Sequence, residues 1–186
     1  MVEKNNQAGP PLNWYDTVFE LIDMRSFSNL WFWIALAVVW STTSHWVIGV
    51  PFDMVQRATR DGEAAMADLE NLTRIYTNRL VFIGNVSGLW ILGIACAGLT
   101  GLAMLGFWYW VEFAQALFLL AFPLSLVGAL SLLTAQKIQA GALHGEDLCR
   151  QLKRHRLYTQ IIGLLAIFVT AMWGMYQNMS VGALGG

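Results

Sequence analysis

The chain has 186 residues, of which 56% are hydrophobic and only 12% are charged, whereas a soluble domain carries roughly 25% charged residues. The formal net charge of −1 gives no electrostatic basis for binding nucleic acid. The length fits one domain. The sequence contains no nucleotide-binding loop, metal-ligand spacing or catalytic triad, so we expect a non-enzymatic protein with no metal or cofactor.

The first 29 residues are predicted to form a polar N-terminus that contains a surface helix. In segment 13–29, apolar side chains occupy one helical face, and Asp16, Glu20 and Asp23 occupy the other. This amphipathic helix is expected to lie on the outer surface of the membrane, with its acidic face in water. The first apolar run begins only after Asn29 and has no basic segment typical of a signal peptide. We therefore expect it to be a retained membrane span.

Long apolar runs follow, each near the roughly 20 residues that cross a bilayer as a helix. They predict an all-α membrane protein with four transmembrane helices, at residues 30–52, 80–104, 107–135 and 161–179. A soluble bundle would need a polar face on each helix, and these runs have none.

The basic residues are confined to two of the connecting segments. They lie in segment 53–79, after the first span, and in segment 136–160, after the third. The positive-inside rule then predicts that both segments are cytosolic arms, in a bacterial inner membrane. Both termini would be periplasmic, with Trp108 and Trp110 as aromatic anchors at the outer interface.

The two arms carry similar sequences. At an offset of 83, "VQRATRDGE" (55–63) aligns with "IQAGALHGE" (138–146), and after a one-residue gap "RIYTN" (74–78) aligns with "RLYTQ" (156–160). The chain is therefore predicted to be two tandem helical hairpins, residues 30–104 and 105–182, with helical cytosolic extensions. A Gly in each turn is expected to take a left-handed conformation.

The repeated basic and aromatic residues have a simple structural interpretation. Arg74 with Tyr76, and Arg156 with Tyr158, are expected to mark where each returning helix enters the membrane, because Arg reaches phosphates and Tyr sits among headgroups. Contact with a ligand or a partner is the alternative.

One span contains a polar cluster, "WSTTSHW" at residues 40–46. Ionisable groups inside a membrane are candidates for function, so His45 is a candidate haem ligand or proton relay. A second histidine at similar depth is lacking, since His144 and His155 lie in an arm. A neutral His45 that is hydrogen-bonded to Ser41 or to a neighbouring helix, or that contacts another subunit, is the simpler interpretation.

The second span contains small residues at intervals that favour close helix packing. This small-residue stripe comprises Gly84, Gly88, Gly93, Ala97 and Gly101. Packing within the bundle is the first interpretation, and self-association of the chain is the alternative.

Residues 13–55, "NWYDTVFELIDMRSFSNLWFWIALAVVWSTTSHWVIGVPFDMV", resemble a family of short bacterial four-span membrane proteins of unknown function. The similarity extends over most of the chain. Some members are labelled as a component of the Suf iron–sulfur assembly complex. The resemblance implies a membrane partner for a cytosolic assembly machine, although this chain carries neither a cysteine cluster nor an ATP site.

The sequence therefore favours an accessory protein that docks a partner, or anionic lipid, through a basic arm. The expected docking residues are Arg150, Lys153, Arg154 and Arg156. A homo-oligomer without another partner would instead favour a small transporter or channel. A haem- or quinone-linked redox subunit using His45 is the third hypothesis.

Overall fold

The computed structural model describes residues 26–184, with side chains through residue 179, so the predicted surface helix lies mostly outside the described residues. The described chain is helical apart from one short β-hairpin and the short connections between helices. Its elements are η1 (Ser26–Ser28), α2 (Leu30–His45), β1 (Trp46–Val47), β2 (Val50–Pro51), α3 (Phe52–Arg60), α4 (Glu63–Ala103), the π-helical turn η2 (Met104–Trp108), α5 (Glu112–Gly141) and α6 (Gly145–Leu184).

Three helices, α4, α5 and α6, are long and apolar enough to cross a membrane. The chain is therefore a helical membrane protein, as its sequence predicts. Helix α2 has 16 residues, which span about 24 Å at 1.5 Å per residue. That length is shorter than the hydrocarbon core of a bilayer, which is about 30 Å.

The helix expected to continue to Phe52 ends instead at His45, and a tight β-hairpin follows it. Trp46 pairs with Pro51, and Val47 with Val50. The two turn residues between them both have positive φ, 54° at Ile48 and 83° at Gly49, as in a type I′ turn. Val47 and Val50 are buried. The apolar run concealed this hairpin, because a buried strand and a buried helix have similar composition.

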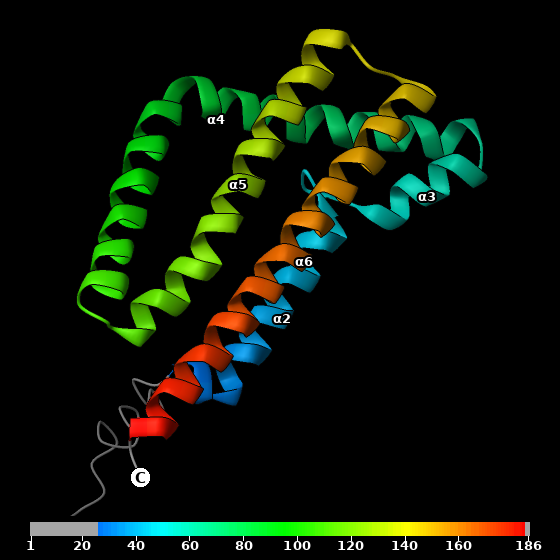
Figure 1. Ribbon diagram of the computed structural model, residues 1–186. Helices are drawn as coiled ribbons and strands as arrows, with labels where there is room; N and C mark the ends of the chain where they lie inside the picture. Colours follow the sequence, from blue (N-terminus) through cyan, green and yellow to red (C-terminus); the bar gives the residue numbers. More distant parts are fainter. Residues whose placement is uncertain (1–25, 185–186) are drawn as a thin grey trace, which may run out of the picture.

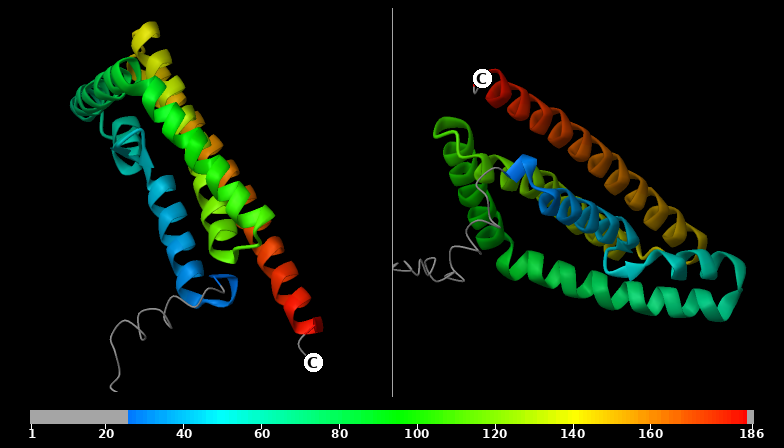
Figure 2. Two further views of the ribbon diagram at one scale, coloured as in Figure 1. Left: turned by 90° about the vertical axis from the view of Figure 1, so that its left-hand side faces the viewer. Right: turned by 90° about the horizontal axis from the view of Figure 1, so that it is seen from below.

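Figures 1 and 2 show that α4 is sharply bent. Its first part crosses α5 and α6 near one end of the molecule, and its second part then runs toward the other end. Helix α6 returns antiparallel to α5, and α2 packs against α6. The start of α2, the end of α6 and the connection from α4 to α5 therefore lie at the same end (Figure 1).

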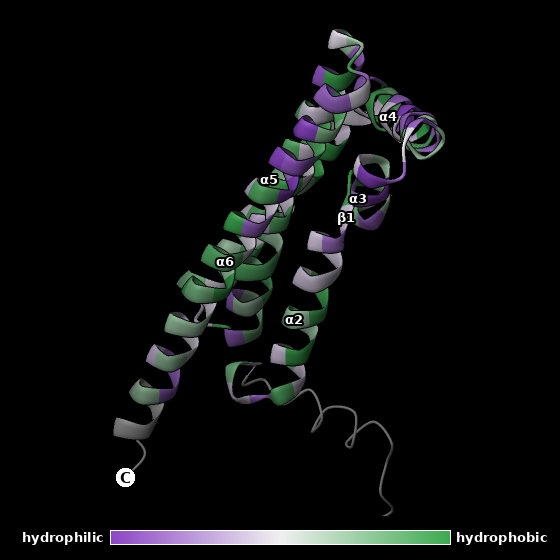
Figure 3. Ribbon diagram, turned by 90° about the vertical axis from the view of Figure 1, so that its right-hand side faces the viewer, coloured by the Kyte–Doolittle hydropathy of each residue, from purple (hydrophilic) through white to green (hydrophobic). Residues whose placement is uncertain are grey.

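The two ends of the molecule differ in polarity. Hydrophilic residues gather where α3, the first part of α4 and the α5–α6 turn meet (Figure 3). We call this the polar end. The opposite end, which we call the aromatic end, carries the exposed Trp108 and Trp110. There the buried Gln115 donates a 2.8 Å hydrogen bond to the Gly106 carbonyl and accepts one of 2.9 Å from the Trp173 indole.

The larger of two buried clusters lies at the polar end. It joins the hairpin and α3 to the first part of α4, the last turns of α5 and the first turns of α6, and it includes Val50, Val55, Leu69, Ala135 and Leu152. A smaller cluster joins α2, α5 and α6 around Trp40. The best-packed part of the chain therefore fixes the relative position of the two arms.

Both turn glycines have positive φ, but Gly62, with ψ −161°, is not in the expected left-handed helical conformation. Gly62 precedes α4 with φ 86°, and Gly145 begins α6 with φ 55°. The left-handed cap of α5 is not Gly145 but Ala142, with φ 42°. The two arms thus turn at matching glycines, although the second turn is longer.

Candidate functional site

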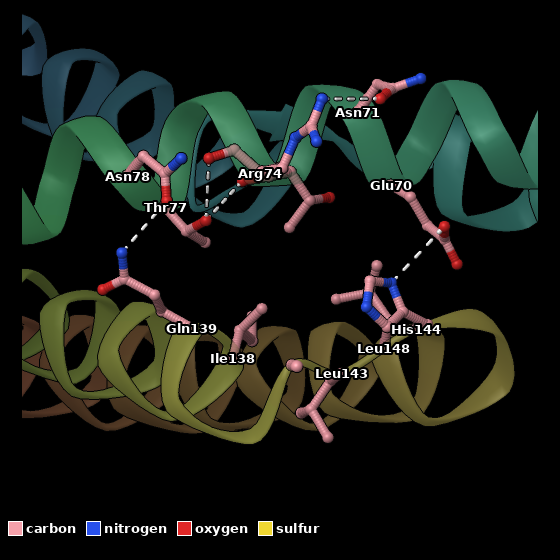
Figure 4. A pocket seen from close by; sticks show the side chains of 12 residues that line it. Glu70, Asn71, Arg74, Thr77, Asn78, Ile138, Gln139, Leu143, His144 and Leu148 are labelled. Carbon is pink, nitrogen blue, oxygen red and sulfur yellow. Dashed lines mark hydrogen bonds and ion pairs between the residues drawn. The ribbon is translucent and has the colours of Figure 1, made fainter.

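A cavity of about 310 Å³ lies at the polar end, where the first part of α4 crosses the end of α5 and the α5–α6 turn. We call it the junction cavity (Figure 4). Helix α4 contributes mostly polar side chains, and the opposite wall mixes Gln139 and His144 with Ile138 and Leu143. A ligand or partner segment in this cavity would therefore meet charged, amide and aliphatic groups together.

Polar contacts tie the two walls of the junction cavity together. The Glu70 carboxylate accepts a 2.7 Å hydrogen bond from the Gly145 backbone N–H and lies 3.6 Å from His144 Nδ1. Because Gly145 begins α6, its N–H has no partner within that helix, and the carboxylate also complements the helix dipole. Farther along, Gln139 donates to the Asn78 side chain at 3.2 Å (Figure 4).

One polar group in the wall of this cavity lacks a partner. Thr73 is 1% exposed, and its hydroxyl forms no hydrogen bond, although its carbonyl accepts one of 2.8 Å from Thr77. An unpaired buried hydroxyl costs about 1–3 kcal/mol. Arg74 is directed along α4 to Asn71, at 3.2 Å, and away from Gln139 (Figure 4).

Three of the four predicted docking residues are exposed on α6. Arg150 makes only a loose, exposed ion pair with Asp147 at 3.8 Å, and pairs of this kind contribute little to stability. Lys153 Nζ lies 3.5 Å from the Thr59 hydroxyl. Arg154 donates a 2.8 Å hydrogen bond to the Tyr158 hydroxyl. These three cations are therefore accessible to a charged partner.

The fourth predicted docking residue, Arg156, is directed inward. Its guanidinium lies 3.7 Å from the centre of the Phe52 ring, and its buried Nε has no hydrogen-bond partner. The matching tyrosines also differ, since Tyr158 bonds to Arg154 whereas Tyr76 packs against Gly49. The structure thus gives these repeated residues different contacts.

The candidate His45 is the last residue of α2 and is exposed. Its ring makes an edge contact with Trp46, with centroids 6.1 Å apart. No hydrogen bond joins it to Ser41, which is also exposed. No hydrogen bond or ring contact joins His45 to His144 or His155, whose polar contacts are with Glu70 and with Ser131 and Thr134, respectively.

The buried histidine is His155, which the sequence analysis placed only within an arm. It is 3% exposed, with Nδ1 3.1 Å from the Thr134 hydroxyl and Nε2 3.4 Å from that of Ser131. Burial lowers the pKa of His155 to about 4. The helical spacing in the sequence could have predicted this burial. His155 lies three residues after Leu152 and four before Thr159, and both of these residues are buried on the same face of α6.

The small-residue stripe packs within the chain at only one of its members. A Cβ added to Gly84 would lie 2.6 Å from Leu132, whereas Gly88, Gly93 and Gly101 have open space around them. Ala97 is exposed. Helix packing within one chain therefore accounts for Gly84 alone.

Comparison of the chain with protein-family models, curated proteins and solved structures found no match. Within residues 26–179 there is no cluster of three or more His, Cys, Asp or Glu side chains that could hold a metal ion.

Proposed function

We propose that this chain is an accessory protein of a bacterial inner membrane that docks a partner at its polar end. The observation that supports the proposal best is the exposure of Arg150, Lys153 and Arg154 on one segment of α6, each with only exposed contacts. We call these three residues the basic segment. Exposed cations attract opposite charge, so these three residues favour a partner with an acidic surface.

The proposal places the polar end in the cytosol, by the positive-inside rule. Helix α2 would serve as a short fourth span, continued by the hairpin, and both termini would be periplasmic. The resemblance of residues 13–55 makes a cytosolic iron–sulfur assembly machine the first partner to look for.

Contacts between equivalent positions support a duplication of the hairpin. At the offset of 83, Met66 corresponds to Cys149, and these two sulfur atoms lie 3.9 Å apart. Leu69 and Leu152, which also correspond at this offset, are both 0% exposed. Thr77 and Thr159, which correspond after the one-residue gap, are both 2% exposed. Contact of a position with its own equivalent is expected near a twofold axis.

The docking proposal can be tested by gentle purification of the tagged chain from native membranes, followed by quantitative mass spectrometry. We expect one stoichiometric partner, reduced at least tenfold in the triple variant Arg150→Gln, Lys153→Gln, Arg154→Gln. Hydrogen bonds between charged groups contribute about 1.5–3 kcal/mol each, so three losses are ample for this effect.

The matched control is the triple variant Arg57→Gln, Arg60→Gln, Arg74→Gln, which removes the same charge from exposed residues of α3 and α4. This control is expected to retain the partner. Equal loss from both variants would refute a specific role for the basic segment and would point to net charge.

Transport remains the second candidate function, and one observation favours it. The hairpin Trp46–Pro51 interrupts the first apolar run beside a second cavity, and non-helical backbone within a membrane is tolerated where it lines a cavity. The polar residues Ser41, Thr42 and His45 are exposed on the outside of one chain. A path along them would need neighbouring copies, so a strictly monomeric protein in nanodiscs would rule it out.

A further inference from the structure

The second cavity, of about 340 Å³, lies between the hairpin, α4 and α5. We call it the hairpin cavity. Its polar lining includes Arg79, Tyr76 and Ser131, and its apolar lining includes Ile83 and Val127. Among the described residues, no Asp or Glu lines it, in contrast to the junction cavity, which contains Glu70. The hairpin cavity therefore has a net positive charge.

Arg79 has no hydrogen bond or ion pair with any described residue, and the Tyr76 hydroxyl has none either. Their positions differ from those of the basic segment, because Arg79 is the last charged residue before the uncharged stretch 80–111. It therefore stands where α4 enters the apolar layer. At that level the abundant anions are phospholipid headgroups, and an Arg side chain extends toward them.

Apolar surface continues along α4 below this cavity. The consecutive residues Leu89, Trp90, Ile91, Leu92, Gly93 and Ile94 are all exposed. Six consecutive residues cover more than one full turn of a helix, so no residue of the described range 26–179 covers this part of α4 on any side. Figures 1 and 2 show the same half of α4 standing apart from the rest of the chain.

We infer that the hairpin cavity binds the phosphate of an anionic membrane phospholipid, with Arg79 as the cation and Tyr76 as a hydroxyl donor. The acyl chains then lie against Ile83 and the exposed half of α4. A positive polar pocket above an apolar surface matches the two parts of such a lipid. The site is independent of the basic segment, which lies on α6.

The test uses the full chain, delipidated in mild detergent and titrated with phosphatidylglycerol or phosphatidylethanolamine, with bound lipid counted by native mass spectrometry. We expect one phosphatidylglycerol to bind in preference to phosphatidylethanolamine. Arg79→Gln should weaken that binding about tenfold, because it removes the cation that forms a charge-assisted hydrogen bond to the phosphate. Ile83→Trp, which fills the cavity without changing its charge, should weaken it similarly.

Arg74→Gln is the matched control, since Arg74 is exposed on the same helix but lines the junction cavity instead. It should leave phosphatidylglycerol binding unchanged. Equal weakening by Arg74→Gln, or no weakening by Arg79→Gln, would overturn the inference.

Two further results would also overturn it. Displacement of the lipid by millimolar inorganic phosphate would indicate a site for free phosphate. Dimers without bound lipid would indicate that a second copy covers this surface.

Discussion

His155 is polar, buried and uncharged, although it directly follows the basic segment on α6. Both ring nitrogens lie near hydroxyls of α5, on Thr134 and Ser131. The neutral imidazole needs one donor and one acceptor as partners, and a hydroxyl can serve as either. Its contacts therefore hold α5 against α6 without a buried charge.

The low pKa of His155 predicts a stability that depends on pH. Its folded-state pKa of about 4 lies below the value near 6.5 of an unfolded chain. As the pH falls below 6.5, the unfolded state binds this proton first, so the folded state loses stability until the pH reaches about 4. The expected loss is at most about 2 kcal/mol between pH 6.5 and 5.

Chemical unfolding of the purified protein at pH 7 and pH 5 would measure this effect. His155→Gln keeps an amide that can bond to both hydroxyls but does not titrate in this range. We expect the variant to show a flatter pH profile, because every other titratable group is the same in both proteins. Identical profiles for the two proteins would contradict the assignment.

Helix α4 shows how one continuous element can have two environments. Its first part carries the buried Leu69, Thr73, Thr77 and Val81, and its second part is almost wholly exposed beyond the bend. The transition lies near Gly84, where the absence of a side chain admits Leu132 of α5. Helices α4 and α5 therefore approach each other closely at Gly84 and move apart beyond it.

Substitutions at two glycines of this helix should show which of them is packed against α5 and which faces open space. Gly84→Leu would place a side chain against Leu132, and overpacking of this kind costs about 1–3 kcal/mol. Gly88→Leu enters open space and should change stability by less than about 0.5 kcal/mol. Thermal unfolding in detergent would measure both, and equal destabilisation would contradict the described packing.

The same pair of variants tests self-association through the small-residue stripe. If copies associate through Gly88, then Gly88→Leu should reduce the oligomer mass in nanodiscs. We expect no change in oligomer mass, because lipid is proposed to cover this surface.

The sequence predicted the long helices well and the irregular features poorly. Apolar length alone identifies α4, α5 and α6. Both turn glycines have positive φ, although Gly62 does not take the left-handed helical conformation that was expected. The hairpin was missed because Val47, Ile48 and Val50 are as apolar as a span, although Gly49 and Pro51 were available signals. The burial of His155 and the inward direction of Arg156 depend on how the two arms cross, which local patterns do not specify.

For the whole molecule, the separation of charge from apolar surface is the main feature. The best-packed cluster joins the two arms at the polar end, while the apolar helices beyond it contact each other less extensively. Such a molecule presents a well-packed polar end and leaves the remaining surface to the membrane. That arrangement suits a docking protein, because the partner meets a surface that does not need to be ordered on binding.

Site-specific photo-crosslinking in living cells would show whether a partner meets the basic segment. A photoreactive residue at Gln151, between Arg150 and Lys153, should give one adduct of defined mass. The same residue at Tyr109, which is exposed at the aromatic end, should not give that adduct. The Gln151 adduct should disappear when Arg150, Lys153 and Arg154 are changed to Gln. An adduct that persists in this background, or the absence of any adduct from Gln151, would contradict docking of a partner at the basic segment.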